Sequence, residues 1–94
     1  MKYDIKKIEN CFAESRSFEY TLPITGEQML THLSGWSIRV NQKLRRPVGI
    51  AEKQGVIIKF ILAGRQFRVS YPEANWLEEK FKFEIFLENT TCIE

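Results

Sequence analysis

Histidine and cysteine, two residue types that often bind metals, are nearly absent from this sequence. There is one histidine and there are two cysteines among 94 residues. The cysteines, Cys11 and Cys92, lie near opposite ends of the chain, so no C-x-x-C pair exists for zinc or redox chemistry. We expect both to be free thiols in a reducing compartment. The sequence therefore predicts neither a metal site nor a disulfide scaffold.

Catalytic and cofactor-binding motifs are missing as well. The only histidine, His32, has no Ser, Cys or acid at a recognisable catalytic spacing. The sequence contains no P-loop and no G-x-G-x-x-G, and the segment ITGEQ offers a single glycine at a helix start. We therefore expect a protein that is not an enzyme and that holds no cofactor.

Long apolar runs are absent too. No stretch approaches the roughly 18 apolar residues that a membrane span needs, and the lysine-containing start lacks the apolar core of a secretory signal. We expect a cytoplasmic protein without membrane contact. The hydrophobic fraction of 44% and the aromatic fraction of 13% are those of a globular chain. We expect a single domain over residues 1–94, with 1–12 ambiguous between strand and helix and 89–94 frayed.

Alternating apolar residues predict a series of strands. The predicted strands are 16–22, 36–41, 47–52, 56–62, 65–71 and 80–88. The last of these, KFKFEIFLE, alternates strictly, and residues 72–79 before it predict a helical turn.

A short helix is predicted after the first of these strands. Thr25 and Gln28 have the spacing of a capping box, and Gly35 fits the left-handed position beyond the helix end. We expect an α+β domain: a mostly antiparallel, strongly twisted sheet of about five to six strands with this helix on one face. A partly closed small β-barrel is the alternative.

The register of two hairpins follows from their apolar residues. Pairing Phe60 with Phe67, Ile58 with Val69 and Val56 with Tyr71 places all six side chains on one buried face, whereas a slip by one residue turns half of the apolar residues outward. This register sets Lys59 directly opposite Arg68, an unfavourable pair of like charges.

The preceding hairpin is predicted to turn over residues 53–55, with Gly55 in the left-handed position. That turn sends Val48 and Ile50 inward and leaves Gly49 and Ala51 on the outer face beside the cations.

Acidic residues are scarce in the middle of the chain. Residues 36–71 contain eight Lys or Arg and one acid, a net charge of +7, whereas residues 72–94 contain two lysines and six glutamates, a net charge of −4. The cations form a candidate surface for an anionic partner: Arg39, Lys43, Arg45, Arg46, Lys59, Arg65 and Arg68. Alternatively, the last strand lies beside 65–71 and Glu84 neutralises Arg68, so that the charges balance internally.

Trp76 and Phe86 are the candidate apolar contacts, because each falls among polar residues in its predicted element. We expect a small interaction protein or accessory subunit whose partner is another protein, and a second copy of the chain, as a homodimer, is one candidate. The alternative is binding of single-stranded RNA or DNA through the basic residues. The aromatic residues of the predicted basic strands face the core, which weakens that alternative.

Overall fold

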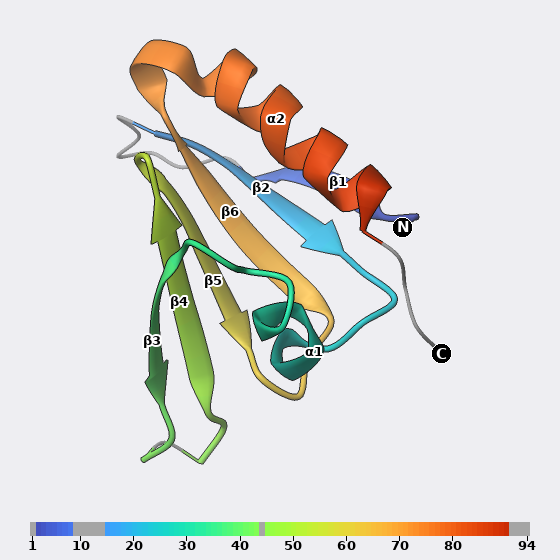
Figure 1. The fold of residues 1–94 in the computed structure, drawn as a ribbon, viewed down its shortest axis with the longest axis vertical. Helices are drawn as coiled ribbons and strands as arrows, with labels where there is room; N and C mark the ends of the chain where they lie inside the picture. The colour runs from blue at the N-terminus through green and yellow to red at the C-terminus, as the bar shows by residue number, and fades with distance from the viewer. Residues whose placement is uncertain (1, 9–14, 44, 91–94) are drawn as a thin grey trace.

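The computed structural model describes residues 2–8, 15–43 and 45–90. Its strands are β1 (Asp4–Ile8), β2 (Ser15–Thr21), β3 (Ser37–Asn41), β4 (Val48–Lys53), β5 (Val56–Ile61) and β6 (Gln66–Pro72). They form one antiparallel sheet in the order β1-β2-β6-β5-β4-β3 (Figure 1). The predicted α+β class and antiparallel sheet are confirmed. The sheet is open, so the barrel alternative is wrong.

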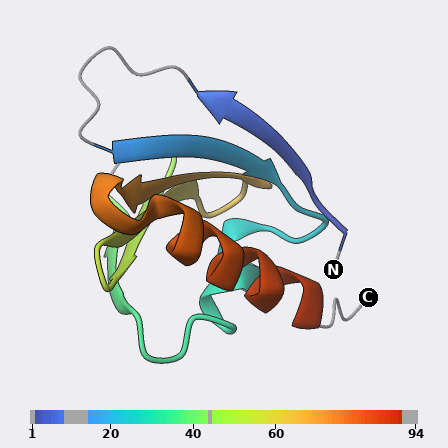
Figure 2. The ribbon, with the colours of Figure 1, turned by 90° about the horizontal axis from the view of Figure 1, so that it is seen from above.

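Two helices cover the same face of this sheet, as Figure 2 shows. The short helix α1 (Gly26–Leu30) follows β2, and a 3-10 turn, η1 (Glu73–Asn75), leads into the longer α2 (Trp76–Asn89). The predicted capping box is present in α1, because Gln28 N donates to Thr25 Oγ1 at 3.3 Å and Thr25 N donates to Gln28 Oε1 at 2.9 Å. The principal helix, however, comes after the sheet rather than after its first strand.

Residues 80–88 belong to helix α2 and not to the predicted last strand. Glu79, Phe83 and Leu87 recur at every fourth position and are buried, whereas Phe81 remains 67% exposed. The apolar residues of KFKFEIFLE alternate, but the buried ones also recur at the four-residue spacing of a helix. The place beside β6 is taken by β2, and Asp4–Ile8, from the ambiguous N-terminal segment, supplies the sixth strand.

Aromatic rings fill the space between α2 and the sheet. The ring of Phe83 meets Tyr20 at a centroid separation of 5.4 Å, Trp36 at 6.3 Å and Tyr71 at 6.4 Å. Tyr20 and Tyr71 are fully buried. Phe83 thus joins the helix to β2, to β6 and to the segment before β3.

The predicted register of the β5–β6 hairpin is confirmed. Phe60 pairs with Phe67, Ile58 pairs with Val69, and all four side chains are buried. Lys59 consequently faces Arg68 across the two strands, as predicted.

The predicted register of the β4–β5 hairpin is wrong by one residue. Lys53 pairs with Val56, so the turn has two residues, Gln54 and Gly55, with φ angles of 52° and 84°. Positive φ at both positions is typical of a type I′ turn, which matches the twist of the strands.

The one-residue shift turns each side chain of β4 to the face of the sheet opposite the predicted one. Gly49 and Ala51 face the core, and Val48 and Ile50 point outward. A Cβ at Gly49 would lie 2.7 Å from the ring of Phe60, so the absent side chain makes room for that ring.

Replacing Gln54 with Asn should stabilise the fold, because Asn tolerates positive φ better than Gln and Asn-Gly is a favoured type I′ pair. We expect the free energy of unfolding to rise by about 0.5–1 kcal/mol in a urea titration. Gln54→Val is the matched control and should lower it, since a β-branched residue resists positive φ. A loss of stability in Gln54→Asn would show that the backbone at residue 54 does not have this conformation.

Candidate functional site: the outer face of the sheet

The face of the sheet opposite α1 and α2 carries no helix within the residues that the structure describes (Figure 2). We call it the outer sheet face. Strand pairing places five side chains in one row across it, from β2 to β3: Glu19, Arg68, Lys59, Ile50 and Arg39. Directly paired residues of an antiparallel sheet point to the same face. Arg39, Lys59 and Arg68 of the predicted cationic surface therefore share this row.

Glu19, and not Glu84, lies beside the two facing cations. Glu19 pairs with Arg68 on the side opposite Lys59. The predicted neutralisation of Arg68 by Glu84 is wrong, because Glu84 belongs to α2 and contacts Tyr20 and Lys80 on the helix-covered face. The acidic helix α2 thus lies on the far side of the sheet from this row.

Aliphatic side chains are interspersed among the cations of the outer sheet face. Ile50 and Ile61 are each 37% exposed, and Val48 and Ile57 are half-buried. A shallow groove of about 370 Å³ runs among these strands, and its lining includes Glu19, Val48, Ile50, Lys59, Ile61 and Arg68. The alkyl stems of Lys and Arg extend such an apolar surface while their charged ends stay in water. This face is therefore both apolar and cationic.

No aromatic ring belongs to the outward-pointing set of the described strands. Phe18, Tyr20, Phe60, Phe67 and Tyr71 all lie in the buried core beneath the helices. The outer sheet face therefore lacks the stacking platform by which sheets hold unpaired bases.

The other four predicted cations lie at one end of the sheet. Lys43, Arg45 and Arg46 are exposed in the β3–β4 connection, and Arg65 is exposed in the β5–β6 turn. Leu62 N donates to Pro47 O at 2.9 Å and so ties the two loops together. Both loops lie at the end of the sheet where α1 sits (Figure 1). The seven predicted cations thus form two groups.

The predicted apolar contacts lie on α2 but are half-buried. The ring of Trp76 stacks on Phe18 at a centroid separation of 6.1 Å, and Phe86 lies 5.8 Å from Phe83. Both therefore pack against the core.

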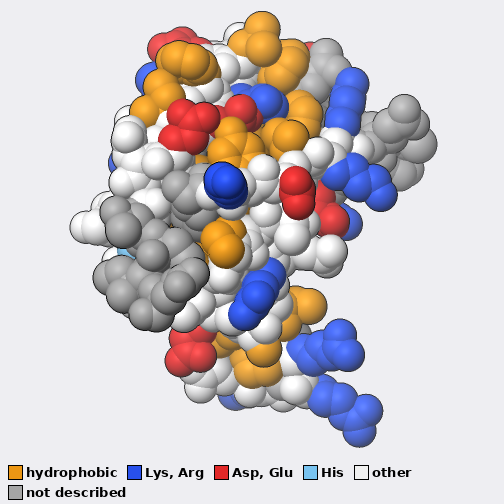
Figure 3. Space-filling view, turned by 90° about the vertical axis from the view of Figure 1, so that its right-hand side faces the viewer, with side chains coloured by type: hydrophobic (Ala, Val, Ile, Leu, Met, Phe, Trp, Pro, Cys, Tyr) orange, Lys and Arg blue, Asp and Glu red, His pale blue; other side chains and the backbone are white. Residues whose placement is uncertain are grey.

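A second exposed surface, which was not predicted from the sequence, lies on the outward side of α2. Leu77 is 66% exposed, Phe81 67% and Ile85 39%. We call these three residues the α2 stripe. In Figure 3 hydrophobic side chains gather at the top, where α2 lies, and several lysine and arginine side chains project from the right-hand side. The sequence signal for this surface was the four-residue spacing of Leu77, Phe81 and Ile85, which places them on one side of a helix.

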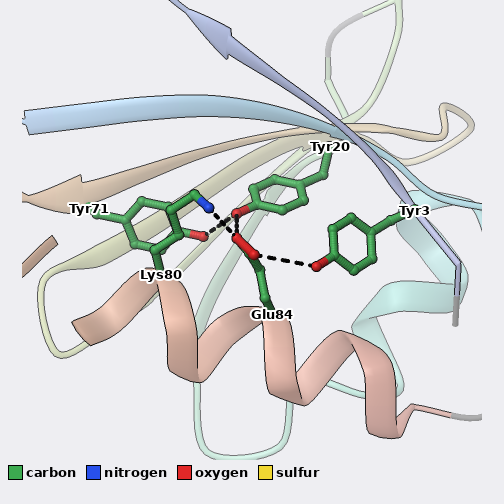
Figure 4. A network of polar contacts seen from close by, with 5 residues as sticks. All are labelled: Tyr3, Tyr20, Tyr71, Lys80 and Glu84. Carbon is green, nitrogen blue, oxygen red and sulfur yellow. Dashed lines mark hydrogen bonds and ion pairs between the residues drawn. The ribbon is translucent and has the colours of Figure 1, made fainter. Parts of the chain in front are cut away.

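A polar network under α2 contains all three tyrosines of the chain (Figure 4). Glu84 accepts hydrogen bonds from Tyr20 at 3.1 Å, from Tyr3 at 3.4 Å and from Lys80 at 2.5 Å. The hydroxyls of Tyr20 and Tyr71 lie 2.7 Å apart. These bonds connect α2 with β2, with β6 and with the segment before β1.

The ionisable hydroxyls of this network remain protonated at neutral pH. Burial raises the pKa of Tyr20 far above its usual value, and the adjacent Tyr71 hydroxyl and Glu84 carboxylate raise it further. Burial also raises the pKa of Tyr71, although its hydrogen bond with Tyr20 partly offsets the rise. A protonated and fully buried phenol is a poor nucleophile or base. The hydrogen bonds from Tyr3 and Tyr20 to Glu84 instead hold α2 on the sheet.

Within residues 2–8, 15–43 and 45–90, no three His, Cys, Asp or Glu side chains gather into a group that could hold a metal ion. No helix of the described residues has the length and apolar character needed to cross a membrane. Cys11 and Cys92 lie outside the described residues. Comparison of the chain with protein-family models, with curated proteins and with solved structures found no match.

Proposed function

We propose that this chain is a non-catalytic interaction protein whose outer sheet face binds an acidic and partly apolar protein surface. One observation carries the proposal. Aliphatic side chains on β4 and β5 are exposed within a row of cations, on a face that no described helix covers. Exposed apolar groups among charged ones are typical of surfaces that bind other proteins.

The two kinds of side chain have different tasks in such an interface. Ile50 and Ile61 supply apolar area that leaves water on binding, which is the main source of affinity. Lys59 and Arg68 repel each other in the free protein, and an acidic partner removes that repulsion. The cations therefore select the sign of the partner and speed its approach.

The proposal can be tested with a synthetic peptide of about 15 residues that forms an acidic amphipathic helix, a common form of protein ligand. We expect fluorescence anisotropy to show binding that is only moderately sensitive to salt. A peptide of the same composition in scrambled order should bind more weakly. Lys59→Glu combined with Arg68→Glu should weaken binding more than about tenfold, because charge reversal sets like charges against each other.

The matched control is Arg45→Glu combined with Arg46→Glu, which changes the net charge equally in a loop outside the groove. It should retain most of the affinity. Equal loss in both double variants would contradict a site on the outer sheet face.

A second candidate function is binding of single-stranded nucleic acid, and the cluster of Lys43, Arg45, Arg46 and Arg65 at one end of the sheet favours it. A mixed-sequence RNA oligonucleotide in the same titration distinguishes the two functions. Tight RNA binding with a steep dependence on salt, abolished by the Arg45 and Arg46 substitutions, would replace protein binding with this function.

A further inference from the structure

The outer sheet face and the α2 stripe carry opposite charge and face in opposite directions. The exposed α2 stripe lies on the side of the helix that is turned away from the sheet. The outer sheet face lies on the opposite side of the sheet from both helices (Figure 2). Residues 73–89 contain five glutamates and two lysines. The acidic helix and the basic strands therefore cannot neutralise each other within one molecule through these surfaces.

Glutamates border the middle and the C-terminal end of the α2 stripe, whereas Lys7 and Lys80 line a hollow with Leu77 at its N-terminal end. Glu78 and Glu88 are exposed and lie three positions from Phe81 and from Ile85, which makes them neighbours of the stripe on the helix surface. Lys82, the exposed lysine of the helix, lies 3.4 Å from Glu78 and 3.5 Å from Glu79, so acidic neighbours already surround it.

The two surfaces also match in size. The stripe from Leu77 to Ile85 spans about 12 Å along the helix axis. The aliphatic row from Ile57 to Ile61 on β5 spans about 13 Å at the rise of a strand. Lys59 lies between these two isoleucines on the same face, where it meets the acidic border of a helix laid over them.

We propose that the partner of the outer sheet face is a second copy of this chain, which docks its α2 stripe there. This inference rests on the proposed function and names the partner of the same site. The contact is head-to-tail, because one molecule contributes its helix and the other contributes its sheet. Such a pair keeps one free outer sheet face on one molecule and one free α2 stripe on the other, so further copies add and the chain forms open linear assemblies.

Sedimentation velocity between about 5 and about 500 µM tests the assembly, because association follows mass action. We expect the average mass of the wild-type chain to rise with concentration beyond twice its 11.1 kDa. One variant, Leu77→Ser with Phe81→Ser, removes the stripe. The other, Lys59→Glu with Arg68→Glu, removes the cations. All four side chains are exposed, so both variants should fold, which circular dichroism checks. Each variant alone should remain a monomer.

The decisive sample is an equimolar mixture of these two variants. The stripe variant keeps an intact outer sheet face, and the cation variant keeps an intact α2 stripe. Together they should form a 1:1 heterodimer and nothing larger, because the remaining surfaces are defective. Arg45→Glu with Arg46→Glu, the control for net charge, should assemble like the wild type.

Three results would overturn the inference. The wild-type chain could remain a monomer at every concentration. The cation variant could dimerise alone, which would indicate symmetric packing of two α2 helices. The mixture could contain only monomers while the wild type assembles. In each case, binding of the acidic helical peptide to the outer sheet face would show that the proposed function still holds.

Discussion

Raising the pH from 8 to 11 should lower the free energy of unfolding by about 3 kcal/mol, because two buried tyrosines resist ionisation. The pKa values of Tyr20 and Tyr71 are raised by burial, whereas unfolding returns both to about 10. Above pH 10 the unfolded chain therefore binds about two fewer protons than the folded chain. The stabilisation is complete below pH 10 and is lost as the pH rises further.

Urea titrations at a series of pH values measure this effect. The groups that face the two hydroxyls are Glu84 and Lys80 of α2 and the hydroxyl of Tyr3, and all three remain in Tyr20→Phe. That variant should lose about half of the dependence on pH, since one tyrosine remains buried. The absorbance of tyrosinate gives an independent reading. Tyr20 and Tyr71 should ionise only on unfolding, and their titration near pH 10 in the folded protein would contradict the network.

The β5–β6 hairpin shows what the sequence determines by itself. Pairing Phe60 with Phe67 buries both rings together with Ile58 and Val69, whereas a slip by one residue would turn half of these side chains outward. The position of Lys59 directly opposite Arg68 follows from that pairing, and this predicted register is confirmed for that reason.

The β4–β5 hairpin shows where such reasoning fails. Burying Val48 and Ile50 looks favourable when only hydrophobicity is counted. The structure instead exposes them, because the ring of Phe60 needs the empty space at Gly49. The shape of the core decides the register here, and shape depends on contacts that a single strand does not reveal. The outward direction of Val48 and Ile50 in the candidate site was missed for the same reason.

The α2 stripe was missed because periodicity was ambiguous. In residues 80–88 the apolar positions alternate, yet β2 and not this segment pairs with β6. Glu, Lys, Leu and Phe all tolerate a helix, and burial of Phe83 and Leu87 against the sheet selects it. Tertiary packing therefore decided the element, and with it the position of an entire candidate surface.

Phe83→Ala should lower the free energy of unfolding by about 3–5 kcal/mol, because its ring fills the space between α2 and the sheet. The ring is 5% exposed and meets aromatic rings of β2 and β6. Small domains are stable by about 5–15 kcal/mol, so the variant should be barely folded at room temperature. Urea titration monitored by tryptophan fluorescence measures the loss, since Trp36 contacts this ring.

Phe81→Ala is the matched control, because the same ring is removed two residues away in the same helix. At 67% exposure its loss should change stability by less than about 0.5 kcal/mol. A strand over 80–88 would place both rings on one face and make both substitutions costly. A helix turns the two rings by about 200° from each other, so one is in the core and the other is in water. Comparable losses of stability in Phe83→Ala and Phe81→Ala would contradict the helix. A much smaller loss in Phe81→Ala would agree with an exposed Phe81 ring, which the contact with a second molecule requires.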